Sequence, residues 1–320
     1  MEGRIYGLIG RSLKHSYSVP IHRELGAKGY RLIELEPEEL AAFLQRDDIG
    51  GLNVTIPYKR DVMACCSSLD ETARAIGSVN TIVRQEDDTL KGYNTDAYGF
   101  SYMARRAGVS FAGRKVVIFG SGGASLTAQY VARQSGASAV VVISRSGPDN
   151  YENLARHADA EVLVNATPVG MYPNTGVMPA GPALFPNCKG VLDLIYNPRR
   201  TALLLRADAL GIPCSDGLPM LVSQAKAAEE LFFGQKIPNS ENERLLKKLY
   251  RDMQNIVLVG MPGSGKTTIG NALSRIAGRR AVDLDAEIEK TAGCTIPAIF
   301  ASSGEEAFRR MEREQAKKWG

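Results

Sequence analysis

The sequence of 320 residues has no apolar run of about 18 or more residues, the length that a membrane-spanning helix needs. It also has no low-complexity tract and no repeat of fixed short period. Its net charge of +4 is too small to indicate nucleic-acid binding, and no strongly basic segment suggests a DNA-binding element. Small anionic ligands are enough to explain such a charge.

The cysteines are few, and their spacing matches no metal-binding motif. The sequence has five, which are Cys65, Cys66, Cys188, Cys214 and Cys294. An odd number of cysteines, together with the absence of a secretory signal pattern at the start of the chain, favours a reducing compartment. We therefore expect a cytoplasmic protein without a disulfide framework.

The composition is that of an ordinary globular protein, with 44% hydrophobic and 23% charged residues. The length suggests two or three domains. Strand-like and helix-like runs alternate with short connections, which indicates an α/β fold. The expected strands are residues 4–10, 30–35, 52–56, 114–119 and 139–143. Residues 162–171 read as a strand and a turn, and residues 191–196 follow them. The expected helices include residues 37–45, 96–105, 201–210 and one that starts at Tyr58.

Two segments place polar and charged residues where a strand-like run ends. Lys59 closes residues 53–59, and Asp96 lies within residues 91–99. A lysine can carry a proton to or from a substrate oxygen, and a neighbouring carboxylate can orient it. Taken alone, such a pair is usually solvated, and Asp96 could simply cap a helix. Because open α/β sheets bind ligands beyond the carboxyl ends of their strands, we expect Thr55, Lys59, Asn80 and Asp96 to converge.

Residues 114–124 read as a strand, a glycine turn and the start of a helix, followed by a second strand. This is the βαβ context in which glycines let the backbone approach a pyrophosphate at a helix N-terminus. An NAD-preferring site usually has an acid at the end of the second strand, but here Arg145 lies between Ser144 and Ser146. A guanidinium with flanking hydroxyls suits a 2′-phosphate, so we predict NADP. The alternative is a solvated surface arginine.

Four blocks, residues 15–18, 53–59, 78–81 and 94–96, resemble the signature segments of the shikimate dehydrogenase family, and the resemblance extends from about Ile5 to Gly234. It implies an NADP-dependent oxidoreductase that reversibly reduces 3-dehydroshikimate to shikimate in the chorismate pathway of aromatic amino acid biosynthesis. Lys59 and Asp96 would be its catalytic residues, and no metal would be needed. The family usually has proline after the second serine, whereas here Val19 intervenes before Pro20.

The resemblance also assigns the binding residues. Ser16 and Ser18 would hold the substrate carboxylate, and the other substrate contacts would be Thr55, Asn80, Tyr196 and Gln224. The cofactor contacts would be Gly120, Gly122, Gly123, Ala124, Ser144, Arg145, Ser146, Thr167, Gly217 and Met220. The family's Asn-Arg-Thr triplet is Ser144-Arg145-Ser146 here, which keeps the arginine.

We expect residues 1–108 to form the substrate domain, completed by residues 216–236. Residues 109–215 would form a Rossmann-type NADP domain. Leu245, Leu246, Leu249, Tyr250 and Met253 recur at helical spacing, which predicts a linker helix within residues 237–254.

Residues 255–268 read as a strand, a complete phosphate loop and a helix start, a specific motif. Gly263, Gly265, Lys266 and Thr267 would hold nucleotide phosphates, with Mg²⁺ at Thr267 and ATP as the ligand. The segment 255–320 resembles the shikimate kinase family, which implies that Asp285 and Arg309 contact shikimate and that Asp283 assists the metal. The segment lacks that family's lid and later substrate segments and is shorter than a domain of roughly 100–200 residues. We therefore expect a truncated fusion without kinase turnover.

Several alternatives stay open. The main substrate could be quinate, or the cofactor NAD. The chain could be a non-catalytic sensor of shikimate-pathway metabolites, or a nucleotide-binding module led by its phosphate loop. A homodimer is possible, and neither nucleic acid nor membrane is an expected partner.

Overall fold

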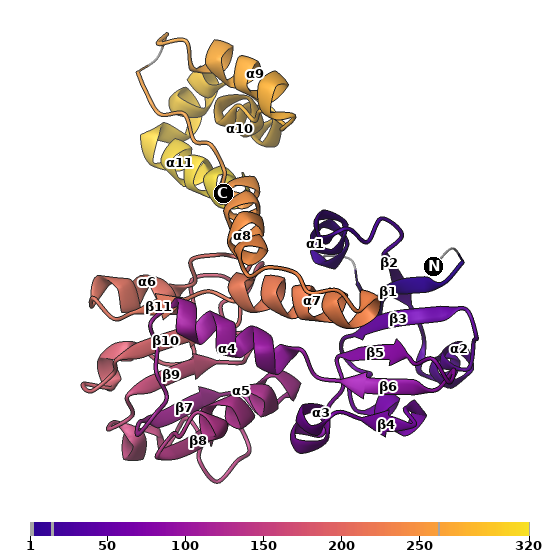
Figure 1. Ribbon diagram of the computed structural model, residues 1–320. Helices are drawn as coiled ribbons and strands as arrows, with labels where there is room; N and C mark the ends of the chain where they lie inside the picture. The colour runs from indigo at the N-terminus through magenta and orange to yellow at the C-terminus, as the bar shows by residue number, and fades with distance from the viewer. Residues whose placement is uncertain (1–2, 14–15, 262, 320) are drawn as a thin grey trace. The chain divides into compact units, whose positions relative to one another are not determined.

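The computed structural model describes residues 3–13, 16–261 and 263–319. The chain divides into two compact units, Met1–Leu249 and Tyr250–Gly320. The first unit contains two β-sheets with helices around them, and the second is helical (Figure 1). His15 and Pro262, which belong to two of the sequence motifs, lie outside the described residues.

The first sheet has the strand order β2-β1-β3-β5-β6-β4. Its strands are β1 (Ile5–Gly10), β2 (Arg31–Glu34), β3 (Ile49–Val54), β4 (Ser68–Leu69), β5 (Thr81–Arg84) and β6 (Leu90–Tyr93). β1 runs parallel to β2 and β3, whereas β5 runs antiparallel to both β3 and β6. Every residue of β3 is buried, as expected for a central strand that is covered on both faces.

Short helices surround this sheet. They are α1 (Ser18–Leu25), α2 (Leu40–Leu44) and α3 (Glu71–Ile76), and the longer α4 (Asp96–Arg106) follows β6. The predicted helix 37–45 begins with a 3₁₀ turn, Pro37–Glu39. The helix predicted from Tyr58 is wrong, because that segment is a turn followed by the 3₁₀ helix Asp61–Cys65. Tyr58 is buried and its hydroxyl donates to the Leu35 carbonyl, so a tertiary contact outweighs local helix propensity.

The second sheet is entirely parallel, with the order β11-β10-β9-β7-β8. Its strands are β7 (Lys115–Phe119), β8 (Ala139–Ile143), β9 (Val162–Asn165), β10 (Gly190–Asp193) and β11 (Cys214–Ser215). Helices α5 (Gly123–Gln134) and α6 (Ala202–Ala209) connect them. Val116, Ile118, Val162 and Val164 are fully buried, which explains the continuous apolar runs in the sequence.

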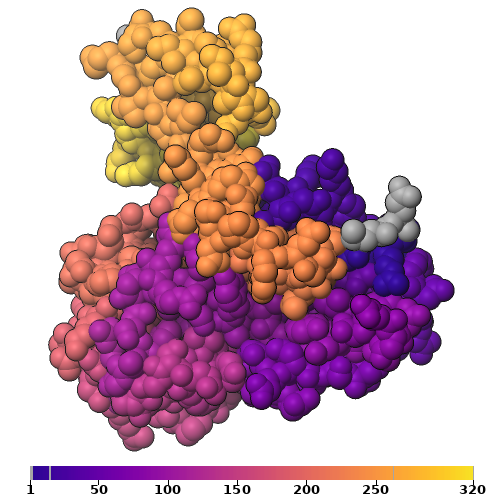
Figure 2. Space-filling view, in the orientation of Figure 1, coloured from indigo at the N-terminus to yellow at the C-terminus, as the bar shows by residue number. Residues whose placement is uncertain are grey.

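Helix α7 (Leu218–Phe233) follows the second sheet but packs on elements of the first, namely α1, β3 and β5, and also on α4. In the space-filling view its orange surface borders both the purple and the magenta parts of Met1–Leu249 (Figure 2). Helix α8 (Ser240–Met253) begins after it, and Arg244 in α8 pairs with Glu24 of α1. The chain therefore returns to its first sheet after completing its second.

The unit Tyr250–Gly320 contains α9 (Lys266–Ala277), α10 (Leu284–Ala292) and α11 (Ile296–Trp319), and its described residues include no strand. The strand predicted before the phosphate loop is therefore wrong, and Val257 and Val259 are 75% and 91% exposed. A strand needs a neighbour to bond its backbone N–H and C=O groups. Among the described residues of the whole chain, no helix is long and apolar enough to span a bilayer.

Candidate functional site

Lys59 and Asp96 form an ion pair beside the ends of strands β3 and β6 and the start of β5, which we call the site edge of the first sheet. The distance from Lys59 Nζ to Asp96 Oδ2 is 2.5 Å, and the two side chains are 24% and 12% exposed. Partial burial limits solvent screening, and the remaining exposure leaves the ammonium accessible to a small ligand. The geometry suits a lysine that a carboxylate holds in one orientation while it exchanges a proton.

The predicted convergence of Thr55, Lys59, Asn80 and Asp96 has a different topological basis from the one expected. Asn80 does not end a strand but directly precedes β5. Because β5 is antiparallel to β3 and β6, its start lies beside the ends of both neighbours. Thr55 and Asp96 follow the carboxyl ends of β3 and β6, whereas Asn80 precedes the amino end of β5. The three residues meet because β5 runs in the opposite direction to its neighbours.

Asp96 is the first residue of α4, and the alternative that its side chain caps this helix is wrong, because no side-chain cap bond forms among the described residues. Asn94 Oδ1 accepts from the Ala97 N–H at 3.3 Å instead. Asn94 Nδ2 donates to the Ser78 carbonyl at 2.8 Å, which fixes the segment before the helix. The carboxylate of Asp96 is therefore available to Lys59.

Asn80 lies at the centre of a buried hydrogen-bond network. Its Oδ1 accepts from the Thr95 N–H at 2.7 Å, and its Nδ2 donates to Thr95 Oγ1 at 2.9 Å and to Gln224 Oε1 at 3.4 Å. Thr81 Oγ1 also donates to Asn80 Oδ1, at 3.1 Å. The network fixes Asn80 and brings Gln224 of α7 to the same edge as Asp96.

Gly99 of α4 explains how α7 can pack so closely on α4. A Cβ at Gly99 would lie 2.7 Å from the Met220 carbonyl oxygen and 3.0 Å from Gln224 Cβ. Any larger residue would push α7 away from α4. The close packing of the two helices thus places Gln224 beside the helix that begins at Asp96.

Ser16 and Ser18 lie at the start of α1. The Ser18 N–H donates to Ser16 Oγ at 3.1 Å, and the Ser18 side chain is buried. Between them, the Tyr17 ring meets Tyr196 edge-on, with ring centroids 5.7 Å apart. Since Tyr196 follows β10, this contact joins the end of the second sheet to the two serines.

The glycine turn after β7 leaves the N-terminus of α5 open. A Cβ at Gly122 or Gly123 would meet no atom within 4 Å, and both residues are exposed. Gly120 has a φ of +100°, and a Cβ there would lie 3.0 Å from the Ala166 carbonyl oxygen. The N–H groups of a helix N-terminus favour an anion, so this turn fits a pyrophosphate. Ala124 continues the same first turn.

A buried polar cluster supports the neighbouring strands β9 and β10. Asn165 Oδ1 accepts from Thr167 Oγ1 at 2.7 Å, and Asn165 Nδ2 donates to Asp193 Oδ1 at 3.0 Å. Asp193 Oδ2 accepts from Thr201 Oγ1 at 2.7 Å. Burial raises the pKa of Asp193 to about 6, although its hydrogen bonds oppose the shift.

Gly217 occupies a place that admits no side chain. A Cβ there would lie 2.1 Å from the Leu194 carbonyl oxygen, and the Gly217 N–H donates to the Ile195 carbonyl at 2.9 Å. Gly217 precedes α7, which carries Met220 one turn on. The structure therefore brings Thr167, Gly217 and Met220 to the ends of the second sheet, on the side of the glycine turn.

Arg145 follows β8 and is exposed, as is Ser146, whereas Ser144 is half-buried. Arg145 forms no ion pair with any residue that the structure describes, so its guanidinium can receive a phosphate. Its charge acts on Tyr151, where it lowers a pKa that burial raises.

In the unit Tyr250–Gly320, the phosphate loop has its left-handed glycines, Gly263 and Gly265, with φ of +75° and +81°. Lys266 Nζ donates to the carbonyls of Gly260 and Met261 at 2.7 and 2.8 Å. Thr267 Oγ1 donates to Asp283 Oδ2 at 3.2 Å, so the two residues predicted to hold Mg²⁺ do meet.

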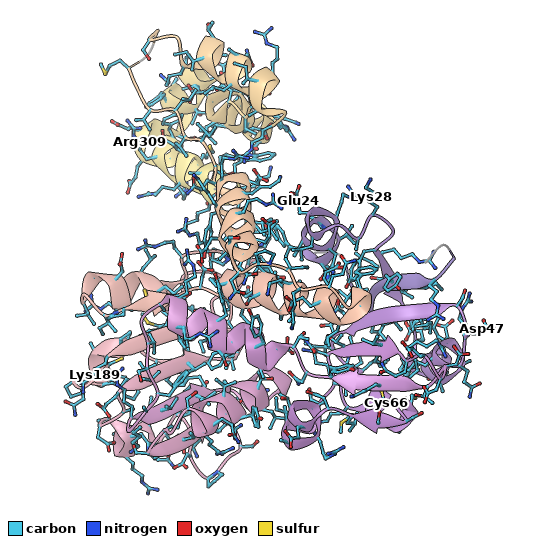
Figure 3. All side chains as sticks on the ribbon, in the orientation of Figure 1. Glu24, Lys28, Asp47, Cys66, Lys189 and Arg309 are labelled. Carbon is cyan, nitrogen blue, oxygen red and sulfur yellow. The ribbon has the colours of Figure 1, made fainter. Side chains whose placement is uncertain are left out.

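Asp285 and Arg309 are the two residues predicted to contact shikimate in this unit, and no contact joins them among the residues that the structure describes. Asp285 is exposed in the first turn of α10. Arg309, labelled on α11 in Figure 3, pairs with Glu312 at 2.9 Å and Glu305 at 3.3 Å on its own helix.

The sequence interpretation missed several residues that build the first site. These are Tyr17, Asn53, Thr81, Thr95, Asn165 and Asp193. Thr95 and Asn53 lie inside the motif blocks, and their types alone could have marked them as buried polar residues. Thr81 also lies in a motif block, but its bond from Asn53, like the bond from Asn165 to Asp193, spans 28 positions, and no local pattern reveals such a contact.

Comparisons with known proteins agree with this architecture. Residues 8–82 match the family model described as shikimate dehydrogenase substrate binding domain, and residues 262–319 match the shikimate kinase model. The NADP(+)-type shikimate dehydrogenase of Clostridium perfringens strain SM101 is 34% identical over 267 residues, which cover 77% of this chain and 98% of that protein.

Two solved structures show the same fold over most of the chain. A chorismate mutase/shikimate 5-dehydrogenase fusion protein from Clostridium acetobutylicum superimposes with a TM-score of 0.76 at 34% identity, covering 80% of this chain and all of that one. Shikimate 5-dehydrogenase from Thermus thermophilus, in complex with NADP(H) and shikimate, gives a TM-score of 0.68 at 29% identity. That match covers 77% of this chain and 99% of the Thermus chain.

Proposed function

The chain belongs to the shikimate dehydrogenase family, and from this premise we propose that it reduces 3-dehydroshikimate to shikimate, reversibly and with NADPH, in the chorismate pathway. The observation that carries the proposal is the 2.5 Å pair of Lys59 and Asp96 beside the Asn80 network. Such a pair serves proton transfer at a carbonyl or hydroxyl oxygen.

Bound NADPH supplies the hydride. Lys59 then donates a proton to the carbonyl oxygen that becomes a hydroxyl, or stabilises its negative charge as a cation. Asp96 orients the Lys59 ammonium and accepts from a ring hydroxyl of the substrate. Because the cofactor supplies the hydride, these residues act by positioning and electrostatics.

The substrate contacts follow the same edge. Ser16 and Ser18 bind the carboxylate, Thr55, Asn80 and Gln224 bind hydroxyls, and Tyr196 faces the substrate. The Asn80–Gln224 bond and the Tyr17–Tyr196 contact support this assignment, because they link α7 and the second sheet to the edge that carries Lys59. We assign residues 1–108 and 216–236 to the substrate domain and residues 109–215 to the NADP domain.

The residues of the second sheet fit NADP. The open N-terminus of α5 suits a pyrophosphate, and the exposed Arg145, with Ser144 and Ser146, suits a 2′-phosphate. Gly217 and Met220 border the nicotinamide side. The absence of an acid at the end of β8 disfavours NAD.

The test follows reduced-nicotinamide absorbance with shikimate plus NADP, shikimate plus NAD, and quinate plus each cofactor. We expect NADP with shikimate to be the fastest pair. Arg145→Ala should raise KM for NADP by about 10–100-fold, since it removes a bidentate charged contact, and should leave KM for shikimate unchanged.

Arg133→Ala, which removes another exposed arginine near the same sheet, is the control and should change neither constant. Equal rates with NAD and NADP, together with an inert Arg145→Ala variant, would overturn the cofactor assignment. Tight shikimate binding without turnover would favour a metabolite sensor, and faster turnover of quinate would make quinate the substrate.

For the unit Tyr250–Gly320 we propose no kinase turnover in this chain. The apolar segment before the phosphate loop is exposed and forms no strand among the described residues, and Arg309 is engaged by Glu305 and Glu312. Lys266, Thr267 and Asp283 fit a nucleotide phosphate with Mg²⁺, so binding of ATP without transfer is compatible with this arrangement.

A further inference from the structure

A buried pair of side chains joins α1 to α7, away from the residues that contact substrate. His22 Nδ1 lies 2.5 Å from Glu229 Oε1, and each side chain is 1% exposed. The two atoms share one hydrogen bond, in which Nδ1 donates when it carries the ring proton. Buried charged groups are rare in proteins unless they are paired, and here each group is the other's partner.

The pair belongs to a longer line of polar contacts. The Tyr30 ring stacks on the His22 ring with centroids 3.7 Å apart and planes at 6°. The Tyr30 hydroxyl donates to Asn53 Oδ1 at 2.7 Å, and Asn53 Nδ2 donates to Thr81 Oγ1 at 3.1 Å. Burial, and then the charge of Glu229, raise the pKa of Tyr30, so its hydroxyl stays protonated and donates.

This line of contacts ends at Asn80 and Gln224, beside Lys59 and Asp96. Thr81 Oγ1 donates to Asn80 Oδ1 at 3.1 Å, and Asn80 contacts Gln224 at 3.4 Å. Along the helices, Ser18 lies one turn before His22 on α1, and Gln224 lies five residues before Glu229 on α7. The pair therefore ties together the two helices that carry proposed contacts to the carboxylate and to a hydroxyl.

We infer that His22 and Glu229 are positioning residues, which set the separation of Ser18 and Gln224 and hence the affinity for the carboxylate-bearing substrate. The inference rests on the proposed dehydrogenase function. A pair that served only to fill the core would affect stability but would not distinguish between the two substrates of the reaction.

The experiment compares KM for shikimate, KM for NADP and kcat in His22→Ala and Glu229→Ala, each of which removes one partner of the bond. We expect KM for shikimate to rise by about 10–100-fold in both variants, because a small displacement of binding groups suffices for such a loss. KM for NADP should stay within about twofold of wild type, since the glycine turn and Arg145 do not contact the pair. The double variant should be no worse than the more affected single variant.

His22→Asn is the rescue variant, because its amide nitrogen can donate from nearly the place of Nδ1, and it should restore most of the affinity. Glu230→Gln is the matched control. Glu230 lies beside Glu229 on α7 and pairs with the buried Lys226 at 3.1 Å, so its loss disturbs the same helix without touching α1. It should leave KM for shikimate unchanged.

Equal changes in both KM values, or unchanged kinetics with a lower melting temperature, would overturn the inference. Failure of both His22→Ala and Glu229→Ala to fold would also overturn it, because stability would then explain the pair. The proposed function is judged separately by the wild type: absence of NADP reduction by the wild-type chain would refute the dehydrogenase, whereas normal wild-type turnover with indifferent variants would refute only the positioning role.

Discussion

The chain contains two glycine turns that resemble each other in sequence, and what lies beneath them differs. The turn at Gly120–Gly123 follows β7, whose residues 116–119 are fully buried between β8 and β9. The turn at Gly263 and Gly265 follows residues 255–260, which are exposed and form no strand. The first turn therefore follows a buried strand, and the second does not.

The cores of the two units differ in the same way. In Met1–Leu249, large clusters of buried apolar side chains lie on both faces of the second sheet. In Tyr250–Gly320 the buried cluster consists of Ile288, Ile299 and Phe308, and Ile276 of α9 is 84% exposed. Little apolar burial implies a low free energy of local unfolding.

The largest expected contrast is in amide hydrogen exchange. Amides of Val116–Phe119 should exchange about 10⁴-fold or more slowly than those of residues 256–259. Exchange in β7 requires global unfolding, whereas the amide groups of residues 256–259 are open to water. Exchange followed by mass spectrometry of short peptic peptides measures both segments in one sample. Comparable protection of residues 256–259 would break the comparison, since it would show that the segment before the second turn is paired.

A smaller contrast concerns one lysine in each unit. Lys59→Ala should lower kcat for shikimate-dependent NADP reduction by about 10²–10⁴-fold, since the variant lacks the group that serves the substrate oxygen. Lys266→Ala should leave that kcat unchanged. ADP formation from ATP and shikimate should be absent in the wild type and in both variants. Wild-type ADP formation that Lys266→Ala abolishes would make the second turn functional and our kinase proposal wrong.

The smallest expected contrast concerns Asp193, the buried acid at the end of β10. Since the pKa of Asp193 is about 6 in the folded chain, above that of a free carboxyl, the folded state keeps a proton that the unfolded state releases. The stability from this proton is present at low pH and is lost as the pH rises through about 6. Between about pH 4 and pH 7, Asp193 should reduce the free energy of unfolding by about 2 kcal/mol.

Asp193→Asn should remove that part of the pH dependence, because an amide does not titrate and can still accept from Ile195 N and donate to Thr201. Urea unfolding of Met1–Leu249 in the full chain, followed by circular dichroism at several pH values, measures the difference. Fluorescence of Trp319, the single tryptophan, follows the second unit. Asp283→Asn, at an exposed acid of that unit, is the control, and parallel pH profiles in wild type and Asp193→Asn would contradict the prediction.

The sequence was sufficient for the α/β class, and its motif blocks singled out Lys59 and Asp96, which the structure pairs. It was not sufficient for the geometry that joins them. The direction of β5 depends on pairing with β3 and β6, and that pairing, not the carboxyl-end rule, places Asn80 beside Asp96. The apolar run at residues 255–260 predicted a strand, but strand formation depends on a neighbouring chain segment that local pattern does not contain.

Pairs far apart in sequence escaped prediction for a related reason. His22 and Glu229 are separated by 207 positions and each alone resembles an ordinary surface residue. Only the packing of α1 on α7 buries them, and the energy of that packing is a property of the assembled fold.

The return of α7 to the first sheet also has a consequence for synthesis on the ribosome. β1, β3, β5 and α4 leave the ribosome early, but α7 follows only after residues 107–217 have been made. Until then the face of the first sheet that α7 covers, including Leu8 and Val83, stays open to solvent. The nascent chain must therefore carry an unfinished first sheet while its second sheet folds, which makes this interval the one in which a chaperone would be most useful.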